Sequence, residues 1–455
     1  MMLADALRSR PSGLAEALAL TDGLDDALVH GLARIDEERA ASLEALTVAF
    51  AGSPLAERVT DSIGKIIAGT VTDEHLAVLA GCRAALFGAV HDALLAPFGR
   101  ERLPSPAPVT GPVLVAGGSR SWLRELAIAG WRGVDHELAA AGSPAVQALL
   151  ADPAAGRLAV LLDGFAAELR AAAPVATLDR VPVRRWADLW SRALLLSQDA
   201  GPTRGAWPAQ PGEPVDGRFL LLGADLHEHP TVFRVQAHGL LETAGGEVRL
   251  VRVSVAAPKV ETITGPAAWR MLTAFPVLRG VLAGHLSAQV NGLTLIGGDL
   301  IWDESRVTPG EPADPFATAR VLLGDATAAS VPPLDRHPAL IAEPVLLEGY
   351  TPGTDAFDLD GVTLPVDLDR LPAAGPITPA LVAASTTCIG LLRWDAGRWS
   401  VQPLAVQATV KRKAVTASTA DWALGPTEAK AAKAEAAAGT AVDVLRERAG
   451  RLLRK

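Results

Sequence analysis

Three residues in the middle of the chain have the types and the spacing of a metal site. Asp225, His227 and His229 alternate along a segment with strand character, so in a regular strand their side chains share one face. Imidazoles at His-x-His spacing are common metal ligands, although tetrahedral zinc needs three or four ligands. The same residues fit the polar end of a β-hairpin, because Pro230 marks a turn directly after them. Both interpretations, a strand metal site and a solvated hairpin end, follow from the sequence.

A second candidate site combines arginines with two tryptophans between residues 184 and 190. On a helix, Trp186 and Trp190 lie on one face, and Arg185 precedes Asp188 by three residues, which suits an ion pair. Two indoles on one face favour a helix packed in the core or at a domain interface. The alternative is a partner-binding surface, where Trp and Arg are enriched. Arg185, Trp186 and Trp190 are therefore candidate partner-binding residues.

The same segment carries a resemblance to other proteins. Its sequence is Arg184-Arg185-Trp186-Ala187-Asp188-Leu189-Trp190. This stretch resembles uncharacterised actinobacterial proteins encoded beside MoxR-type ATPases and von Willebrand factor A proteins, over less than a twentieth of the chain. The resemblance implies an accessory subunit of a MoxR-type ATPase system.

Charge is distributed unevenly along the chain, whose formal net charge is −9. Residues 1–100 carry 8 basic and 14 acidic side chains, whereas residues 411–455 carry 10 basic and 5 acidic ones. An acidic body argues against general affinity for nucleic acid, because phosphate contacts need clustered Lys and Arg. The C-terminal segment is predicted to form a basic helix. Through Arg446, Arg448 and Arg451 it would bind an acidic partner or the chain's own N-terminal region.

The composition is that of a packed protein. The chain has 455 residues, of which 49% are hydrophobic, and its mean hydropathy is +0.24, so two or three domains with their own cores are expected. Cys82 and Cys388 lie in apolar surroundings, which predicts buried, reduced thiols. The N-terminus lacks the pattern of a signal peptide, and no uncharged apolar run reaches about 18 residues. We expect a soluble, cytoplasmic protein without membrane contact.

The order of the patterns predicts an α+β fold. Apolar residues at helical spacing fill residues 1–103, a helical bundle, and residues 113–200, a second helical region. Pro- and Gly-rich stretches follow each of them. Residues 218–410 alternate like strands and predict a mostly antiparallel β-rich domain, and residues 426–455 predict the basic, Ala-rich C-terminal helix.

Turn signals divide the β-rich domain into hairpins. Three strands are expected between Arg218 and Ala257. Further hairpins are predicted at Asn291-Gly292, at Asp360-Gly361 and at Ala396-Gly397, because glycine accepts the positive φ of a tight turn. The last of these would set Trp394 opposite Trp399. One helix is expected from 267 to 283, with Pro276 as a potential break.

Signatures of catalysis are missing from the sequence. It contains no Gly-x-Ser-x-Gly elbow and no evident Cys–His pairing, and the glycines near Ser119 lack the pattern of a phosphate-binding loop. We therefore predict a non-enzymatic interaction or scaffold protein with a protein partner and no cofactor. The alternative is a metal-dependent enzyme or metal-binding protein that uses Asp225, His227 and His229.

Overall fold

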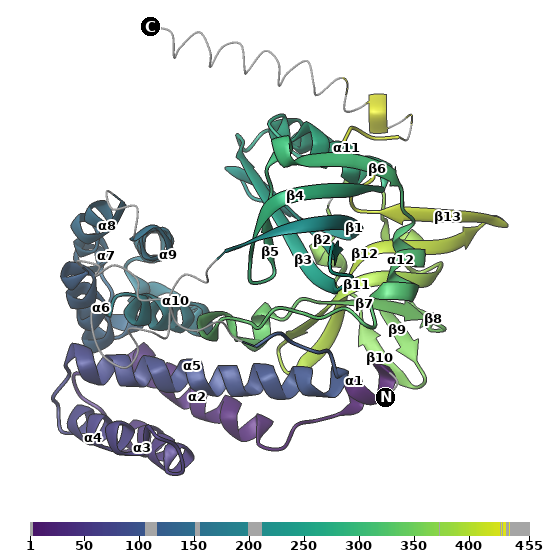
Figure 1. Ribbon diagram of the computed structural model, residues 1–455. Helices are drawn as coiled ribbons and strands as arrows, with labels where there is room; N and C mark the ends of the chain where they lie inside the picture. The colour runs from purple at the N-terminus through teal and green to yellow at the C-terminus, as the bar shows by residue number, and fades with distance from the viewer. Residues whose placement is uncertain are drawn as a thin grey trace, which may run out of the picture.

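A computed structural model describes residues 3–104, 116–150, 155–198, 212–372 and 374–427, with positions 429, 431–433 and 436. Helices fill the N-terminal half and mostly antiparallel strands the C-terminal half, so the predicted α+β class is confirmed. Figure 1 shows the two halves side by side. Arg446, Arg448 and Arg451 lie outside the described residues, as does most of the predicted C-terminal helix.

The helical half begins with five helices that follow the predicted apolar spacing. They are α1 (Leu3–Arg8), α2 (Leu14–His30), α3 (Glu37–Phe50), α4 (Ala56–Ile67) and α5 (Asp73–Leu95). Two of them start at a side-chain cap: Asp36 accepts the Arg39 amide at α3, and Thr72 accepts the His75 amide at α5. Helix α5 passes into a short 3-10 turn, Ala96–Phe98, which contains Pro97.

The second group of helices packs into the same core as the first. Its members are α6 (Gly117–Ala129), α7 (His136–Ala141), α8 (Ser143–Leu150), α9 (Gly156–Ala172) and α10 (Val183–Leu196). A single apolar cluster draws side chains from both groups. Arg83 of α5 is buried within it, donates to Asp25 of α2 at 2.8 Å and to the Arg184 carbonyl at 3.1 Å, and so joins three helices.

One helical segment, Asp73–Phe98, is long and apolar enough to cross a membrane, judged by length and composition among the described residues. Half of its apolar window is buried inside the protein. Arg83, at the middle of this segment, forms its ion pair inside the helical core. The segment therefore has the packing of a core helix.

The first β unit is a closed barrel. Its elements are β1 (Glu213–Glu228), β2 (Val232–Thr243), β3 (Val248–Pro258), the 3-10 helix η5 (Gly265–Leu272), α11 (Pro276–Gly284), β4 (Leu286–Ile296), β5 (Asp299–Ile301) and β6 (Val307–Pro312). The strands pair in the order β1-β2-β3-β5-β4, and β4 pairs with β1 again. The β3–β5 pair is parallel, and the helical segments lie between β3 and β4. The sixth strand, β6, also pairs with β4, so the six strands form one mostly antiparallel sheet that closes on itself.

Two predictions for this unit need correction. The expected hairpin at Asn291-Gly292 is wrong, because β4 runs through both residues. They form a bulge against Asp216 of β1, whose carboxylate accepts the Gly292 amide at 2.7 Å, and Gly292 supplies a φ of 63°. The single helix expected from 267 to 283 is two helices, because Pro276 starts a new one.

A second sheet covers the outer face of the barrel. The remaining elements are α12 (Pro315–Leu322), β7 (Glu343–Glu348), β8 (Thr351–Pro352), β9 (Ala356–Leu359), β10 (Val362–Pro365), α13 (Pro379–Val382), β11 (Ser385–Asp395), β12 (Arg398–Val410) and β13 (Lys413–Ser418). The sheet order is β13-β12-β11-β7. Leu222 and Leu240 of the barrel pack with Ile389 of this sheet and Phe316 of α12. The outer surface of β1 and β2 is therefore partly buried.

The predicted hairpins of the second β unit are confirmed. Leu359 pairs with Val362 across Asp360-Gly361, and Trp394 pairs with Trp399 across Ala396-Gly397. The two indole rings meet edge to face with their centroids 5.2 Å apart.

Candidate functional site

A groove of about 800 Å³ lies beside the turn that joins β1 and β2. We call it the β1–β2 groove. Its floor comes from residues 225–230 and Phe233, one wall from residues of the segment 259–265 with Trp269, and the other wall from residues 369–372 with Ala374. Trp269 and Phe233 meet edge to face at 5.4 Å and are both buried, so they support the floor from below. A barrel turn, a helical segment and a loop of the second β unit thus build one concave surface.

Asp225 is a buried polar group of this groove. Its side chain is 4% exposed, and its carboxylate accepts hydrogen bonds from His227 at 2.9 Å, from Arg393 of β11 at 3.0 Å and from Gln402 of β12 at 2.7 Å. Burial would raise the pKa of Asp225, but the hydrogen bonds and charges of His227, Gln402 and Arg393 outweigh it and hold that pKa well below its usual range. The carboxylate therefore joins the barrel to the second sheet.

The predicted metal ligands do not converge. Asp225 and His227 contact each other, whereas the exposed His229 lies nearest to Thr231, with Nδ1 3.4 Å from the hydroxyl. Within the described part of the chain, no three His, Cys, Asp or Glu side chains are placed to hold a metal ion. The turn after His229 is tight, and Arg234 lies directly opposite His227, so a cation occupies the face on which a metal ion would sit.

The wall formed by residues 259–265 is fixed by a buried lysine. The side chain of Lys259 is 2% exposed, and its ammonium donates to the Ile263 carbonyl at 2.9 Å and pairs with Glu228 at 3.6 Å. The Glu228 carboxylate also accepts the Gly265 amide, at 3.1 Å. Glu228 follows His227 at the end of β1, so the strand end holds the loop in place.

One group of the groove has the chemistry of a general base. His227 is partly exposed, and its Nε2 is held by the Asp225 carboxylate, the arrangement that orients an imidazole in many enzymes. The described side chains that line the groove include no serine and no cysteine that could serve as its nucleophile. The groove therefore offers a positioned imidazole without a partner for covalent catalysis.

The tryptophan-rich segment lies in helix α10, and its indoles are in the helical core. Trp186 is 1% and Trp190 0% exposed, as the core-helix interpretation expects. The Trp190 indole donates to the Leu123 carbonyl at 2.9 Å. Arg185 is exposed and pairs with Glu168 of α9, not with Asp188 as its spacing suggested. In this arrangement only Arg185 of the three candidates is accessible to a partner.

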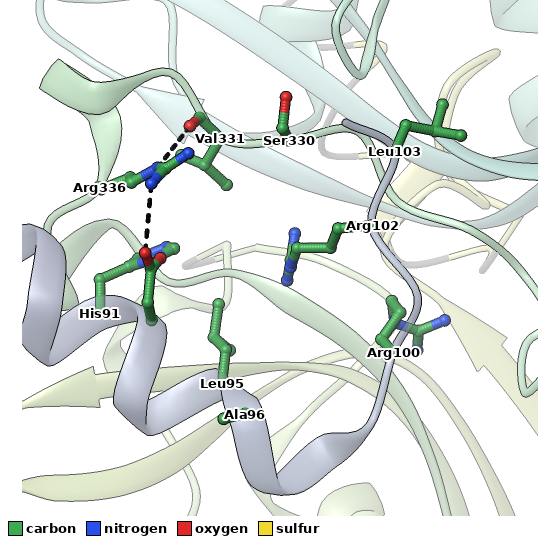
Figure 2. Close-up of a pocket in the computed structure, with 10 residues that line it drawn as sticks. His91, Leu95, Ala96, Arg100, Arg102, Leu103, Ser330, Val331 and Arg336 are labelled. Atoms are coloured by element: carbon green, nitrogen blue, oxygen red, sulfur yellow. Dashed lines mark hydrogen bonds and ion pairs between the residues drawn. The ribbon is translucent and has the colours of Figure 1, made fainter. Parts of the chain in front are cut away.

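A smaller cavity of about 360 Å³ lies where the helical half meets the β units (Figure 2). Three arginines line it, and each is already bonded. Arg100 and Arg102 both pair with Glu343, the latter at 2.9 Å, and Arg336 donates to the Val331 carbonyl at 2.8 Å. Arg336 also pairs with an aspartate of α5 at 3.2 Å. These ion pairs hold the two halves together, so we assign this cavity a structural role.

Several residues of the site gave weaker signals in the sequence than the His-x-His motif. Arg393 and Gln402 bind Asp225 from two strands for which the sequence predicted a hairpin and no site. Lys259 comes just after the end of a predicted strand. The sequence does contain one indication of a buried ion pair. Arg393 comes directly after Leu391 and Leu392, and a charge within an apolar strand needs a partner when it is buried. Its partner Asp225, however, is 168 residues away in the chain, and a sequence pattern does not reveal a contact between residues so far apart.

Comparison of the chain with protein-family models, with curated proteins and with solved structures finds no match in any of the three.

Proposed function

We propose that this chain is a non-catalytic interaction protein and that the β1–β2 groove receives a short segment of a protein partner. One observation carries the proposal: the buried charges of the groove are all bonded to fixed protein groups. Asp225 is bonded to His227, Arg393 and Gln402, and Lys259 to Glu228. Walls held in this way are preorganised for binding, and such walls reduce the entropy lost when a partner docks.

The rim of the groove has the mixed character of a protein interface. Val260 is 53% and Val232 39% exposed, next to the groove walls. Glu261, Asp369 and Arg370 are exposed among the lining residues. Exposed apolar side chains surrounded by charges of both signs are typical of surfaces that bind proteins. Acidic side chains outnumber basic ones along the lining, four to two, so a negatively charged ligand is not favoured here.

The cysteines agree with this proposal. Cys82 and Cys388 are both buried, as predicted, and burial raises the pKa of the Cys82 thiol to about 12. Burial also raises the pKa of the Cys388 thiol. Since the thiolate is the reactive form, neither side chain has the properties of a nucleophile.

A substitution that fills the groove tests the proposal. Ala374 is exposed on the groove wall, and a Cβ on Gly265 would lie 3.2 Å from its side chain, so the two walls are close there. Ala374→Trp should block the groove without entering the core. The control is Ala171→Trp, which places the same indole on an exposed position of α9. Tagged full-length chains are captured from cells, and the proteins bound to each are quantified by mass spectrometry.

The expected result is one partner that binds the wild type and the Ala171→Trp variant and is lost with Ala374→Trp. Circular dichroism checks that both variants are folded. Equal binding by Ala374→Trp would refute the role of the groove. Stoichiometric metal in the purified wild type, lost in His227→Ala, would replace this proposal by the metal-dependent alternative.

A further inference from the structure

The hairpin formed by β12 and β13 extends beyond the sheet to which it belongs. The last residue of β12 that pairs with β11 is Ala408, so residues 409–414 have no neighbouring strand outside the hairpin. All six residues are exposed. In Figure 1 the hairpin projects from the second sheet on the side away from the helical half. The tip is therefore free to contact another molecule.

The turn of this hairpin has an unfavourable backbone. Lys411 and Arg412 both have positive φ, 49° and 66°. Side chains with a Cβ adopt this region at a cost, which is why glycine is preferred there. The two other tight turns of the same unit place Gly361 and Gly397 at the corresponding second position. At the projecting tip an arginine stands where those turns have glycine, and such strain is a pointer to function.

The tip also holds three adjacent cations without counterions. Lys411, Arg412 and Lys413 form no ion pair within the described part of the chain, whereas most buried or half-buried arginines of the protein do. Next to them, Val410 is 37% exposed. The tip therefore combines three unpaired positive charges with one exposed apolar side chain on a narrow arm. We call it the basic tip, residues 410–413.

A surface of complementary character lies at the opposite end of the molecule. Helices α3 and α4 border a shallow groove of about 690 Å³, whose lining includes Val48, 78% exposed, and Glu57. Glu44 precedes Val48 by one helical turn and lies on the same side. Neither glutamate forms an ion pair in the part of the chain that the structure describes. We call this surface the acidic groove.

We propose that the basic tip of one chain docks in the acidic groove of a second copy. Val410 would contact Val48, and the cations of the tip would face Glu44 and Glu57. In Figure 1 helices α3 and α4 and the β12–β13 hairpin lie at opposite ends of the molecule, so one chain cannot join its own tip to its own groove. The contact is heterologous, and copies add head to tail. This surface is distinct from the β1–β2 groove, so the inference does not depend on the proposed function.

Charge reversal tests the contact. One variant carries Lys411→Glu, Arg412→Glu and Lys413→Glu, and the other carries Glu44→Lys and Glu57→Lys. Sedimentation velocity of the full chain is measured over a range of concentrations at low and at high salt. Wild type should self-associate at low salt. Its affinity for a second copy should be roughly tenfold lower at high salt, because salt screens exposed ion pairs.

Each reversed variant alone should remain a monomer, and a 1:1 mixture of the two should associate again. Recovery in the mixture shows that both variants are folded. A control with Arg170→Glu and Arg180→Glu, two exposed residues elsewhere, should associate like wild type. A wild type that stays monomeric at every concentration, or a mixture that does not associate, would overturn the proposal. Binding of a DNA or RNA oligonucleotide that is lost on reversal of the tip would also overturn it.

Discussion

Replacing Asp225 by Asn should lower the free energy of unfolding, because it removes the ion pair between the barrel and the second sheet. The side chain keeps almost the same shape. The carboxylate is 4% exposed and is the counterion of Arg393, which is 12% exposed. Removing one partner of a buried ion pair leaves an uncompensated charge, which costs about 3–5 kcal/mol. Asn keeps one acceptor oxygen for Gln402 or Arg393, so we expect the lower end, about 3 kcal/mol.

The same network predicts how stability depends on acidity. The pKa of Asp225 is held below its usual range in the folded protein and is about 3.9 in an unfolded chain. A depressed folded pKa means that the ionised carboxylate stabilises the fold. This contribution is fully present above about pH 5, decreases below about pH 4 and is lost as the pH falls through the folded value. Asp225→Asn should therefore lose less stability than wild type on acidification.

Urea denaturation followed by circular dichroism, at pH 7 and at about pH 3, inside the window where the contribution is being lost, measures both effects. The matched control is Asp163→Asn, which replaces an exposed carboxylate on α9. It should change the free energy of unfolding by less than about 0.5 kcal/mol. A loss below about 1 kcal/mol for Asp225→Asn at pH 7, or an unchanged acid dependence, would refute the assignment of Asp225 as the link between the two sheets.

Other substitutions test the junctions of the fold by the same denaturation assay. Glu343→Ala should cost about 3–5 kcal/mol, because it leaves two arginines at the junction of the halves without a counterion; a surface-like loss below about 1 kcal/mol would contradict this. Gly223→Ala should cost about 1–3 kcal/mol, since its Cβ would lie 2.6 Å from that of Leu404, and a neutral outcome would show that the sheets can separate there. Trp186→Ala should cost about 3–5 kcal/mol; a folded, equally stable variant would restore this indole as a binding residue.

Local patterns were sufficient to predict the fold class and several hairpins. The turns at Asp360-Gly361 and Ala396-Gly397 were predicted correctly because a tight turn is determined by its own residues. Asn291-Gly292 carries the same signal, yet it bulges within a strand, since Asp216 of another strand binds its amide. The closure of the barrel between β1 and β4 depends on such distant pairing, which periodicity does not encode.

The candidate site could be predicted only where its residues are neighbours in the chain. The alternation of Asp225 and His227 placed both on one face, and the structure joins them. Arg393 and Gln402, which complete the network, come from strands that a sequence pattern cannot bring beside β1. Lys411 was counted only within the basic C-terminal segment, and the hairpin that it ends, with its strained turn, became evident only in the fold.

The role of the β1–β2 groove in binding a protein is tested most directly by site-specific photo-crosslinking. A photoreactive amino acid is placed at Glu261, on the groove wall, and in a second chain at Asp163, on the exposed face of α9. We predict a crosslink from position 261 to one protein, suppressed by excess wild type but not by excess Ala374→Trp variant, and no such product from position 163. The same products from both positions, or none from position 261, would contradict the account.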